Sequence, residues 1–206
     1  MDLELCCKEQ FTVKVEELIS KGQGPFSIAE VDIDNFLSIN NTYGHEIGDE
    51  VIKKIAAVFK QNLSSIDMIT RKGDEFTILL INKGSERSFM EMEEIRRYLS
   101  DNIFDMSCQN KTENVYITIS CGIASYPRDA KNMVELFRVA DSSLFRAKKL
   151  GKNKVCLSEA ESMVLKSSYF TKTQADRLGE LAKCTDKTEA FLLREALDDL
   201  FKKYSQ

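Results

Sequence analysis

The strongest constraint on the fold is a hairpin signal in the middle of the chain. Two short apolar runs, 68–71 and 76–81, are separated by the four residues Lys-Gly-Asp-Glu. A glycine in so short a connection is typical of a β-hairpin turn, because glycine adopts positive φ without steric strain. The two runs therefore predict neighbouring antiparallel strands.

Helical and extended patterns alternate on both sides of this hairpin. The predicted strands are 26–34, 115–124 and 155–157, and the predicted helices are 11–20, 51–63, 86–104 and 134–149. A polar, glycine-interrupted stretch, 35–45, precedes the second of these helices. Strands interleaved with helices indicate an α/β fold in which helices pack on a mixed sheet.

Composition narrows the class of protein but not its function. The 206 residues are 43% hydrophobic and 30% charged, which is ordinary for a folded domain and excludes wholesale disorder. The net charge of −4 is not basic enough to indicate nucleic acid binding by charge alone. No apolar run is long enough to span a membrane, and the first ten residues carry no basic and apolar signal. We therefore expect a cytoplasmic protein with no membrane partner.

Three carboxylates stand at ends of predicted strands. Asp32 lies near the end of the first strand, and Asp74 and Glu75 lie in the hairpin turn. If the hairpin pairs beside that strand, the three side chains converge at one edge, as phosphoryl-transfer enzymes require for Mg²⁺. The alternative is that these acids are simply solvated at strand ends and turns. Spacing alone favours the alternative.

Four motifs in order favour the metal site over solvated acids. They are the run Asp-Ile-Asp through Gly-His-Glu-Ile-Gly-Asp at 32–49, Lys-Gly-Asp-Glu-Phe at 72–76, Ser-Cys-Gly-Ile-Ala at 120–124, and Ala-Asp through Gly-Lys-Asn at 140–153. Together they resemble the GGDEF-domain diguanylate cyclases, a family of bacterial signalling enzymes. The resemblance covers about 5–157 and implies a GGDEF domain at 1–158. It also implies a palm-like, ferredoxin-like nucleotide cyclase fold and a nucleotidyltransferase that condenses two GTP, one per subunit of a dimer, into cyclic di-GMP.

The resemblance implies a metal centre. Asp32, the carbonyl of Ile33, Asp74 and Glu75 would hold or face Mg²⁺ or Mn²⁺. Asp74 and Glu75 would be the catalytic carboxylates, and Glu75 would help to deprotonate the attacking 3′-hydroxyl.

The resemblance also implies the contacts to GTP. Asn40 and Asp49 would hydrogen-bond the guanine edge, which offers both donors and acceptors. Lys148 and Lys152 would contact phosphates. A phosphate-binding lysine of the family is replaced by leucine at position 37, and we hypothesise that Lys72 supplies a cation in its place.

The hairpin and its surroundings depart from the family pattern. Lys72 stands where a second glycine is usual, and the segment 67–73 is one residue short. We expect a type I′-like turn in which a non-glycine residue costs roughly 1–2 kcal/mol and misplaces Asp74. Ser64 stands where the family's product-inhibition site has arginine, three residues before Asp67, so we expect no feedback by product.

The remaining residues, 163–206, resemble a ribbon-helix-helix module. The predicted strand is 164–171, and the predicted helices are 173–183 and 188–204. Such a module is too small to bury a core alone and is stable as an intertwined dimer whose paired strands enter the DNA major groove. The alternative is a helical pair that only dimerises the chain.

The DNA-binding candidates follow from this module. They are Lys166, Ser167, Tyr169 and Thr188. In the family register Ser167 and Tyr169 face the groove, whereas a slip by one residue exposes Lys166. Thr188 would cap the second helix, where free amides suit a phosphate.

The leading expectation is therefore a diguanylate cyclase that works as a homodimer or tetramer. The alternative is a catalytically degenerate GGDEF domain that acts as a GTP- or cyclic-dinucleotide-responsive DNA-binding transcriptional regulator. A third possibility is a related cyclase with a different dinucleotide product.

Overall fold

The computed structural model describes residues 5–108, 111–158 and 170–185, together with residues 189, 192, 193, 196, 200, 203 and 204. The chain divides into two compact units, 1–161 and 162–206. None of the described helices has both the length and the apolar content needed to cross a membrane.

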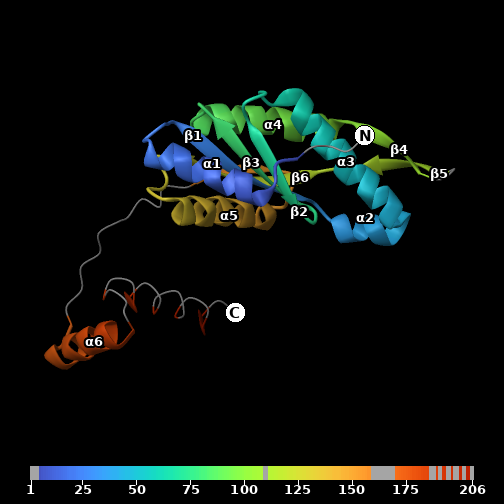
Figure 1. Cartoon of the computed structure of the whole chain (residues 1–206). Coiled ribbons are helices and arrows are strands. Elements are labelled where there is room, and N and C mark those ends of the chain that lie inside the picture. Colours follow the sequence, from blue (N-terminus) through green and yellow to red (C-terminus); the bar gives the residue numbers. More distant parts are fainter. Residues whose placement is uncertain are drawn as a thin grey trace. The chain divides into compact units, whose positions relative to one another are not determined.

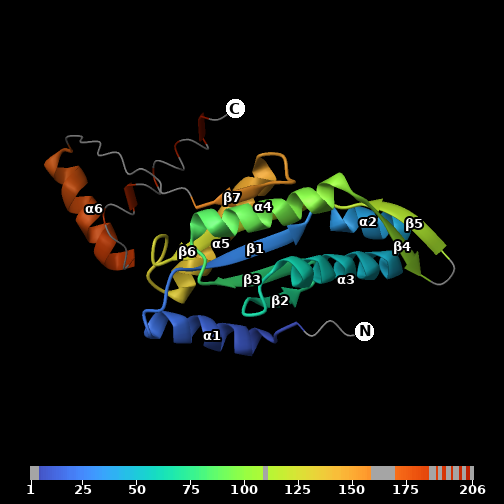
Figure 2. The same cartoon turned by 90° about the horizontal axis from the view of Figure 1, so that it is seen from above.

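A five-stranded mixed sheet forms the centre of the first unit (Figures 1 and 2). Its strands, in spatial order, are β2 (Met68–Lys72), β3 (Glu75–Ile81), β1 (Phe26–Ile33), β6 (Ile119–Tyr126) and β7 (Val155–Leu157). Only the pair β6 and β7 is parallel, and the other pairs are antiparallel. The predicted mixed sheet is confirmed, and the hairpin lies beside β1, which is the condition for the three carboxylates to converge.

Helices cover both faces of this sheet (Figure 1). The helices α1 (Lys8–Ser20) and α5 (Met133–Lys149) lie on one face, and α3 (His45–Asn62) and α4 (Ser85–Asp101) lie on the other. A short helix, α2 (Phe36–Tyr43), joins β1 to α3.

Side chains alternate along β1, so the strand contributes to the hydrophobic core on both faces of the sheet. Val31 belongs to the core cluster on the α3 and α4 side, whereas Ile28 packs with α1 and α5. Because side chains alternate with a period of two, Glu30 and Asp32 lie on the same face as Ile28. The polar end of β1 is therefore on the face that α5 covers.

Two predicted elements are wrong at one corner of the molecule. The expected helix 86–104 ends at Asp101, because the chain turns into β4 (Ile103–Cys108). The expected strand 115–124 is split between β5 (Lys111–Tyr116), which pairs with β4 in a separate two-stranded sheet, and β6.

The split has a tertiary cause. The run from 115 to 124 is rich in β-branched residues, so its sequence carries no visible break. In the fold, the carbonyl of Thr118 accepts a hydrogen bond from the backbone N–H of Asp34 at 2.9 Å, between the two ladders. The break between β5 and β6 thus coincides with a contact to the chain after β1, which the local sequence does not reveal.

In the second unit, α6 (Lys172–Thr185) agrees with the expected helix at 173–183. The described residues beyond 185 are helical. The predicted strand at 164–171 falls largely outside the described residues. The DNA-binding candidates Lys166, Ser167, Tyr169 and Thr188 all lie outside them as well.

Candidate functional site

Strand pairing brings the predicted carboxylates to one edge of the sheet. Asp32 on β1 is the Cα partner of Glu75 on β3, and Glu75 is in turn the partner of Lys72 on β2. Residues that are partners across strands present their side chains on the same face. Asp74 precedes Glu75 in the turn, so all three predicted acids lie at this end of β1.

The hairpin turn is shorter than expected and is not strained at Lys72. Lys72 is the last residue of β2, and positive φ occurs in the turn at Gly73, with a value of 67°. A positive φ at the first central residue is the requirement of a type II′ turn, which suits a two-residue hairpin. Arg71 also donates from Nη1 to the Gly73 carbonyl at 2.6 Å. The expectation of strain at Lys72 is therefore wrong.

Asp32 already has a cationic partner. The Nζ atom of Lys148, in the last turn of α5, lies 2.7 Å from Asp32 Oδ2, and the Asp32 side chain is 16% exposed. Burial raises the pKa of Asp32; the hydrogen bond and charge of Lys148 oppose that rise, and the negative charges of Asp74 and Asp34 add to it. A carboxyl group in this setting gains stability from a cation beside it.

The donor set fits Mg²⁺ together with a nucleotide. Among the described residues, no three His, Cys, Asp or Glu side chains already form a complete metal-binding group. Mg²⁺ commonly takes only one or two carboxylates and completes its shell with water and substrate phosphates. Asp32, Asp74 and the carbonyl of Ile33 are ligands of that kind. Asp74 precedes Glu75, the strand partner of Asp32, and its negative charge adds to the rise in the pKa of Asp32.

The predicted guanine-binding residues lie where α2 meets α3. Asn40 Oδ1 is buried and has no hydrogen-bond partner. A Cβ atom at Gly48 would lie 1.9 Å from that oxygen, so only glycine permits this close approach. Asp49 follows Gly48 and is exposed. An unsatisfied amide oxygen beside an accessible carboxylate offers polar atoms to an incoming base.

The second predicted phosphate ligand is also near the end of β1. Lys152 donates from Nζ to Asn35 Oδ1 at 2.6 Å. Asp34 is 4% exposed and accepts hydrogen bonds from Ser120 Oγ at 2.7 Å and from the Asn153 N–H at 2.9 Å. Sequence reasoning missed this structural role of Asp34, because both partners are far away in the chain.

Asp67, three residues after Ser64, has a side chain that faces inward. The side chain of Asp67 is buried, lies 2.5 Å from Lys83 Nζ and accepts the N–H of Ile81 at 2.9 Å. The N–H of Ser64 donates to the same carboxylate at 2.9 Å. Glu91 completes the cluster at 2.8 Å from Lys83. Asp67 therefore has a structural use in this chain, and the absence of product feedback stays a prediction.

A cavity beside the hairpin was not predicted. It has a volume of about 750 Å³ and lies between α1, α5 and the strands. Glu30 lines it, and burial raises the pKa of Glu30 to about 7. Thr77 donates to Glu30 Oε2 at 2.9 Å and opposes this rise, whereas the charges of Asp141 and Glu75 add to it. The acidic row on this face thus extends beyond the predicted site residues.

Comparison with known proteins identifies the motif-bearing region. Residues 4–154 match the model of the family described as diguanylate cyclase, GGDEF domain. The uncharacterized protein YhcK of Bacillus subtilis is 36% identical over 135 residues, which are 65% of this chain and 37% of that protein. Diguanylate cyclase A of Treponema denticola is 32% identical over 155 residues, which are 72% of this chain and 41% of that protein. The chain thus spans well under half the length of these relatives.

Solved structures agree with the fold. The GGDEF domain of DgcB from Caulobacter crescentus, solved in complex with c-di-GMP, is 26% identical with a TM-score of 0.69, and the match covers 78% of this chain and 95% of that one. The active GGEEF domain of a Vibrio cholerae diguanylate cyclase is 28% identical with a TM-score of 0.68, covering 77% and 100%. The family resemblance drawn from the four motifs is confirmed.

Proposed function

The chain belongs to the diguanylate cyclase GGDEF domain family, and on that premise we propose that it condenses two molecules of GTP into cyclic di-GMP. The observation that carries the proposal is the grouping of Asp32, Asp74 and Glu75 at one sheet edge, with Lys148 at 2.7 Å from Asp32. Carboxylates beside a lysine are what phosphoryl transfer from a metal-bound triphosphate requires.

In this proposal, Asp32, Asp74 and the carbonyl of Ile33 hold Mg²⁺ or Mn²⁺. The bound ion would neutralise charge on the triphosphate and favour ionisation of the attacking hydroxyl. Lys148, which pairs with Asp32 at the end of α5, would exchange this carboxylate for a phosphate oxygen when the nucleotide binds. Lys152 and Lys72 provide further positive charge around the triphosphate.

Glu75 is the proposed acceptor of the proton from the 3′-hydroxyl. The hydroxyl oxygen of one GTP forms a bond to the α-phosphorus of the other, and pyrophosphate leaves. A second attack in the opposite direction closes the ring and releases a second pyrophosphate. The two nucleotides must face each other, so the proposal requires two chains.

Asn40 and Asp49 are the proposed guanine contacts. Asp49 can accept hydrogen bonds from the N1–H and the 2-amino group of guanine, whereas adenine presents no donor at N1. The buried, unpaired Oδ1 of Asn40 supports a role in contacting the base. A site with polar groups that need partners discriminates strongly against a base that leaves them unpaired.

The second unit is the proposed dimerisation element. Its described residues include large apolar side chains that are exposed, namely Phe170, Leu193, Leu200 and Tyr204. Exposed apolar groups on a small unit favour association with a second copy. Pairing of the tails would raise the effective concentration of one catalytic domain around another. DNA binding through Lys166, Ser167, Tyr169 and Thr188 stays a separate prediction.

The dimer can be tested on the full chain. Sedimentation of the unaltered protein is expected to give a dimer or tetramer. Leu193→Glu places a charge among the apolar side chains and is expected to shift the protein toward monomer. An unaltered protein that remains monomeric at high concentration would contradict this part of the proposal.

The activity is tested by incubating the protein with GTP and Mg²⁺ and identifying products by chromatography and mass spectrometry. We expect cyclic di-GMP from the unaltered chain and none from Asp74→Ala. Asp105→Ala, which removes an exposed carboxylate on β4 away from the hairpin, is the matched control and should remain active. Absence of product from the unaltered chain at high protein concentration would reject the proposal.

A further inference from the structure

The connection between α5 and β7 has an unusual backbone. Gly151, Lys152 and Asn153 follow one another with φ values of 107°, 62° and 47°. Positive φ is disfavoured for residues that carry a Cβ atom, although asparagine tolerates it better than most. Two consecutive non-glycine residues in this region persist only when the surrounding structure holds them.

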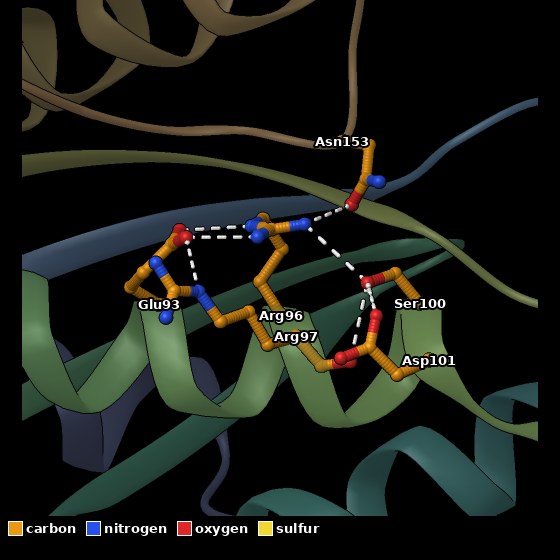
Figure 3. Close-up of polar contacts among 6 residues, drawn as sticks. All are labelled: Glu93, Arg96, Arg97, Ser100, Asp101 and Asn153. Atoms are coloured by element: carbon orange, nitrogen blue, oxygen red, sulfur yellow. Dashed lines mark hydrogen bonds and ion pairs between the residues drawn. The ribbon is translucent and has the colours of Figure 1, made fainter.

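Asn153 is held at both its backbone and its side chain. Its backbone N–H donates to Asp34 Oδ2 at 2.9 Å. Its side-chain Oδ1 accepts a hydrogen bond from Arg96 Nη1 at 2.7 Å, as Figure 3 shows. Asp34 and Arg96 belong to different parts of the fold, so the loop is fixed between the end of β1 and α4.

The direction of the Arg96 side chain is itself fixed. Its Nε and Nη2 atoms donate to the two carboxylate oxygens of Glu93, each at 2.8 Å (Figure 3). This paired arrangement uses one side of the guanidinium plane and leaves Nη1 to reach Asn153. The Arg96 side chain is 13% exposed. The hydrogen bonds that Arg96 donates to Glu93 raise the pKa of Arg96, so the group stays charged.

These contacts determine where Lys152 can point. Lys152 lies between Gly151 and Asn153, and its Nζ donates to Asn35 Oδ1 at 2.6 Å. Asn35 follows Asp34, the residue that holds the Asn153 backbone. Both the backbone next to Lys152 and its ammonium group are therefore tied to the segment that immediately follows Asp32 and Ile33.

We propose that Arg96, aligned by Glu93, is a positioning residue for the phosphates of the bound nucleotide, because it holds Asn153 and thereby directs Lys152 toward the end of β1. Among the described contacts of Arg96, none is to Lys152 or to the site carboxylates Asp32, Asp74 and Glu75. The inference rests on the proposed function, since it assumes that Lys152 binds a phosphate group.

The first test measures the affinity of the full chain for a non-hydrolysable GTP analogue with Mg²⁺. Arg96→Gln is expected to weaken binding about tenfold, because misplacing one charged ligand by about an ångström is costly. Arg97→Gln is the matched control: Arg97 also bonds Glu93, with Nε at 3.0 Å from Oε1, but its side chain is 67% exposed and has no bond to the loop. The control should bind as the unaltered chain does.

A double-variant comparison separates positioning from general stability. In the Lys152→Ala background, Arg96→Gln should add little to the loss of affinity, because the residue through which it acts is already absent. If the two losses are instead fully additive, Arg96 does not act through Lys152 and the inference is wrong.

Asn153→Gly separates the backbone from the side chain. Glycine adopts positive φ freely but removes the acceptor for Arg96. We expect Asn153→Gly to weaken binding of the GTP analogue about as much as Arg96→Gln does. Binding equal to that of the unaltered chain would mean that the left-handed backbone alone is sufficient, and would overturn the inference.

Hydrogen exchange provides a readout that needs no nucleotide. The amide of Asn153 is expected to exchange faster in Arg96→Gln than in Arg97→Gln or the unaltered chain. Equal exchange in all three overturns the inference whether or not the analogue binds. Failure of the unaltered chain to bind the analogue contradicts the proposed function itself, so the two failures are distinguishable.

Discussion

The two sides of the site are built in different ways. The acidic side is held by the main chain, because strand register places Asp32 opposite Glu75 and both neighbours, Val31 and Phe76, are buried. On the basic side, the loop of Lys152 is held by side chains, because it depends on Asp34 and on a contact from α4. A single substitution outside the site can therefore disturb Lys152 more easily than the carboxylates.

The difference also separates function from folding. On the acidic side, replacing Asp32 or Asp74 should remove chemistry and leave the sheet intact. On the basic side, local geometry and ligand binding change together. The following predictions test this contrast, beginning with the largest effect.

Asp32→Asn should reduce the rate of product formation at least about a hundredfold, because it removes a charged ligand of the proposed metal site. Since asparagine keeps the shape of the side chain and the backbone pairing of β1, the thermal unfolding midpoint should change little. Steady-state rates and thermal melting check both parts. A variant that keeps most of its activity would show that this carboxylate is not a metal ligand.

Gly122→Ala should destabilise the fold by more than about 3 kcal/mol, since overpacking against backbone cannot relax easily. An added Cβ would lie 2.0 Å from the N atom of Leu144 and 2.3 Å from the Ala140 carbonyl, so α5 and its Lys148 would be displaced from the sheet. Urea unfolding measures the effect. Gly84→Ala is the control, because its Cβ would be 3.7 Å from the nearest atom; similar losses in both would contradict the packing argument.

Glu30→Gln should change the pH dependence of stability. The folded pKa of Glu30 is raised from 4.5 to about 7, so its favourable contribution is complete below pH 4.5 and is lost as pH rises through 7. Above pH 7 the glutamine variant should be more stable by on the order of 2–3 kcal/mol. Thr77→Val removes a hydrogen bond that lowers the pKa of Glu30. The pH at which the contribution of Glu30 to stability is lost should therefore rise in this variant. If the free energy of unfolding of Glu30→Gln and that of the unaltered chain change in parallel across this pH range, the raised pKa of Glu30 is refuted.

Lys72→Ala should have the smallest effect. Lys72 is exposed at the end of β2, where a charge contributes little to stability. If it supplies the cation that position 37 lacks, the KM for GTP should rise roughly threefold with little change in kcat. Lys72→Gly should behave in the same way. Unchanged or improved GTP affinity in either variant would show that Lys72 is not a phosphate contact.

The contrast between the two sides also explains what sequence could predict. The hairpin, β1 and the carboxylates were predictable, because alternation and turn glycines are local signals that also set the register. The split between β5 and β6 was not, since it depends on the backbone bond between Asp34 and Thr118.

The same limit applies to the loop of Lys152. The motif indicated a lysine near the phosphates but gave no sign of the partners of Asn153, which are 57 residues away at Arg96 and 119 residues away at Asp34. At Lys72, in contrast, the sequence predicted a feature that the structure lacks. Its family position suggested a strained turn, whereas the shortened hairpin places it in an ordinary strand conformation.

The most direct test of the central claim is the ratio of pyrophosphate released to cyclic dinucleotide formed when the unaltered chain is given GTP and Mg²⁺. Condensation in both directions predicts two pyrophosphates for every cyclic di-GMP, with the rate per chain increasing with protein concentration until dimerisation is complete. Pyrophosphate release without a cyclic product, or no release at any protein concentration, would contradict the account.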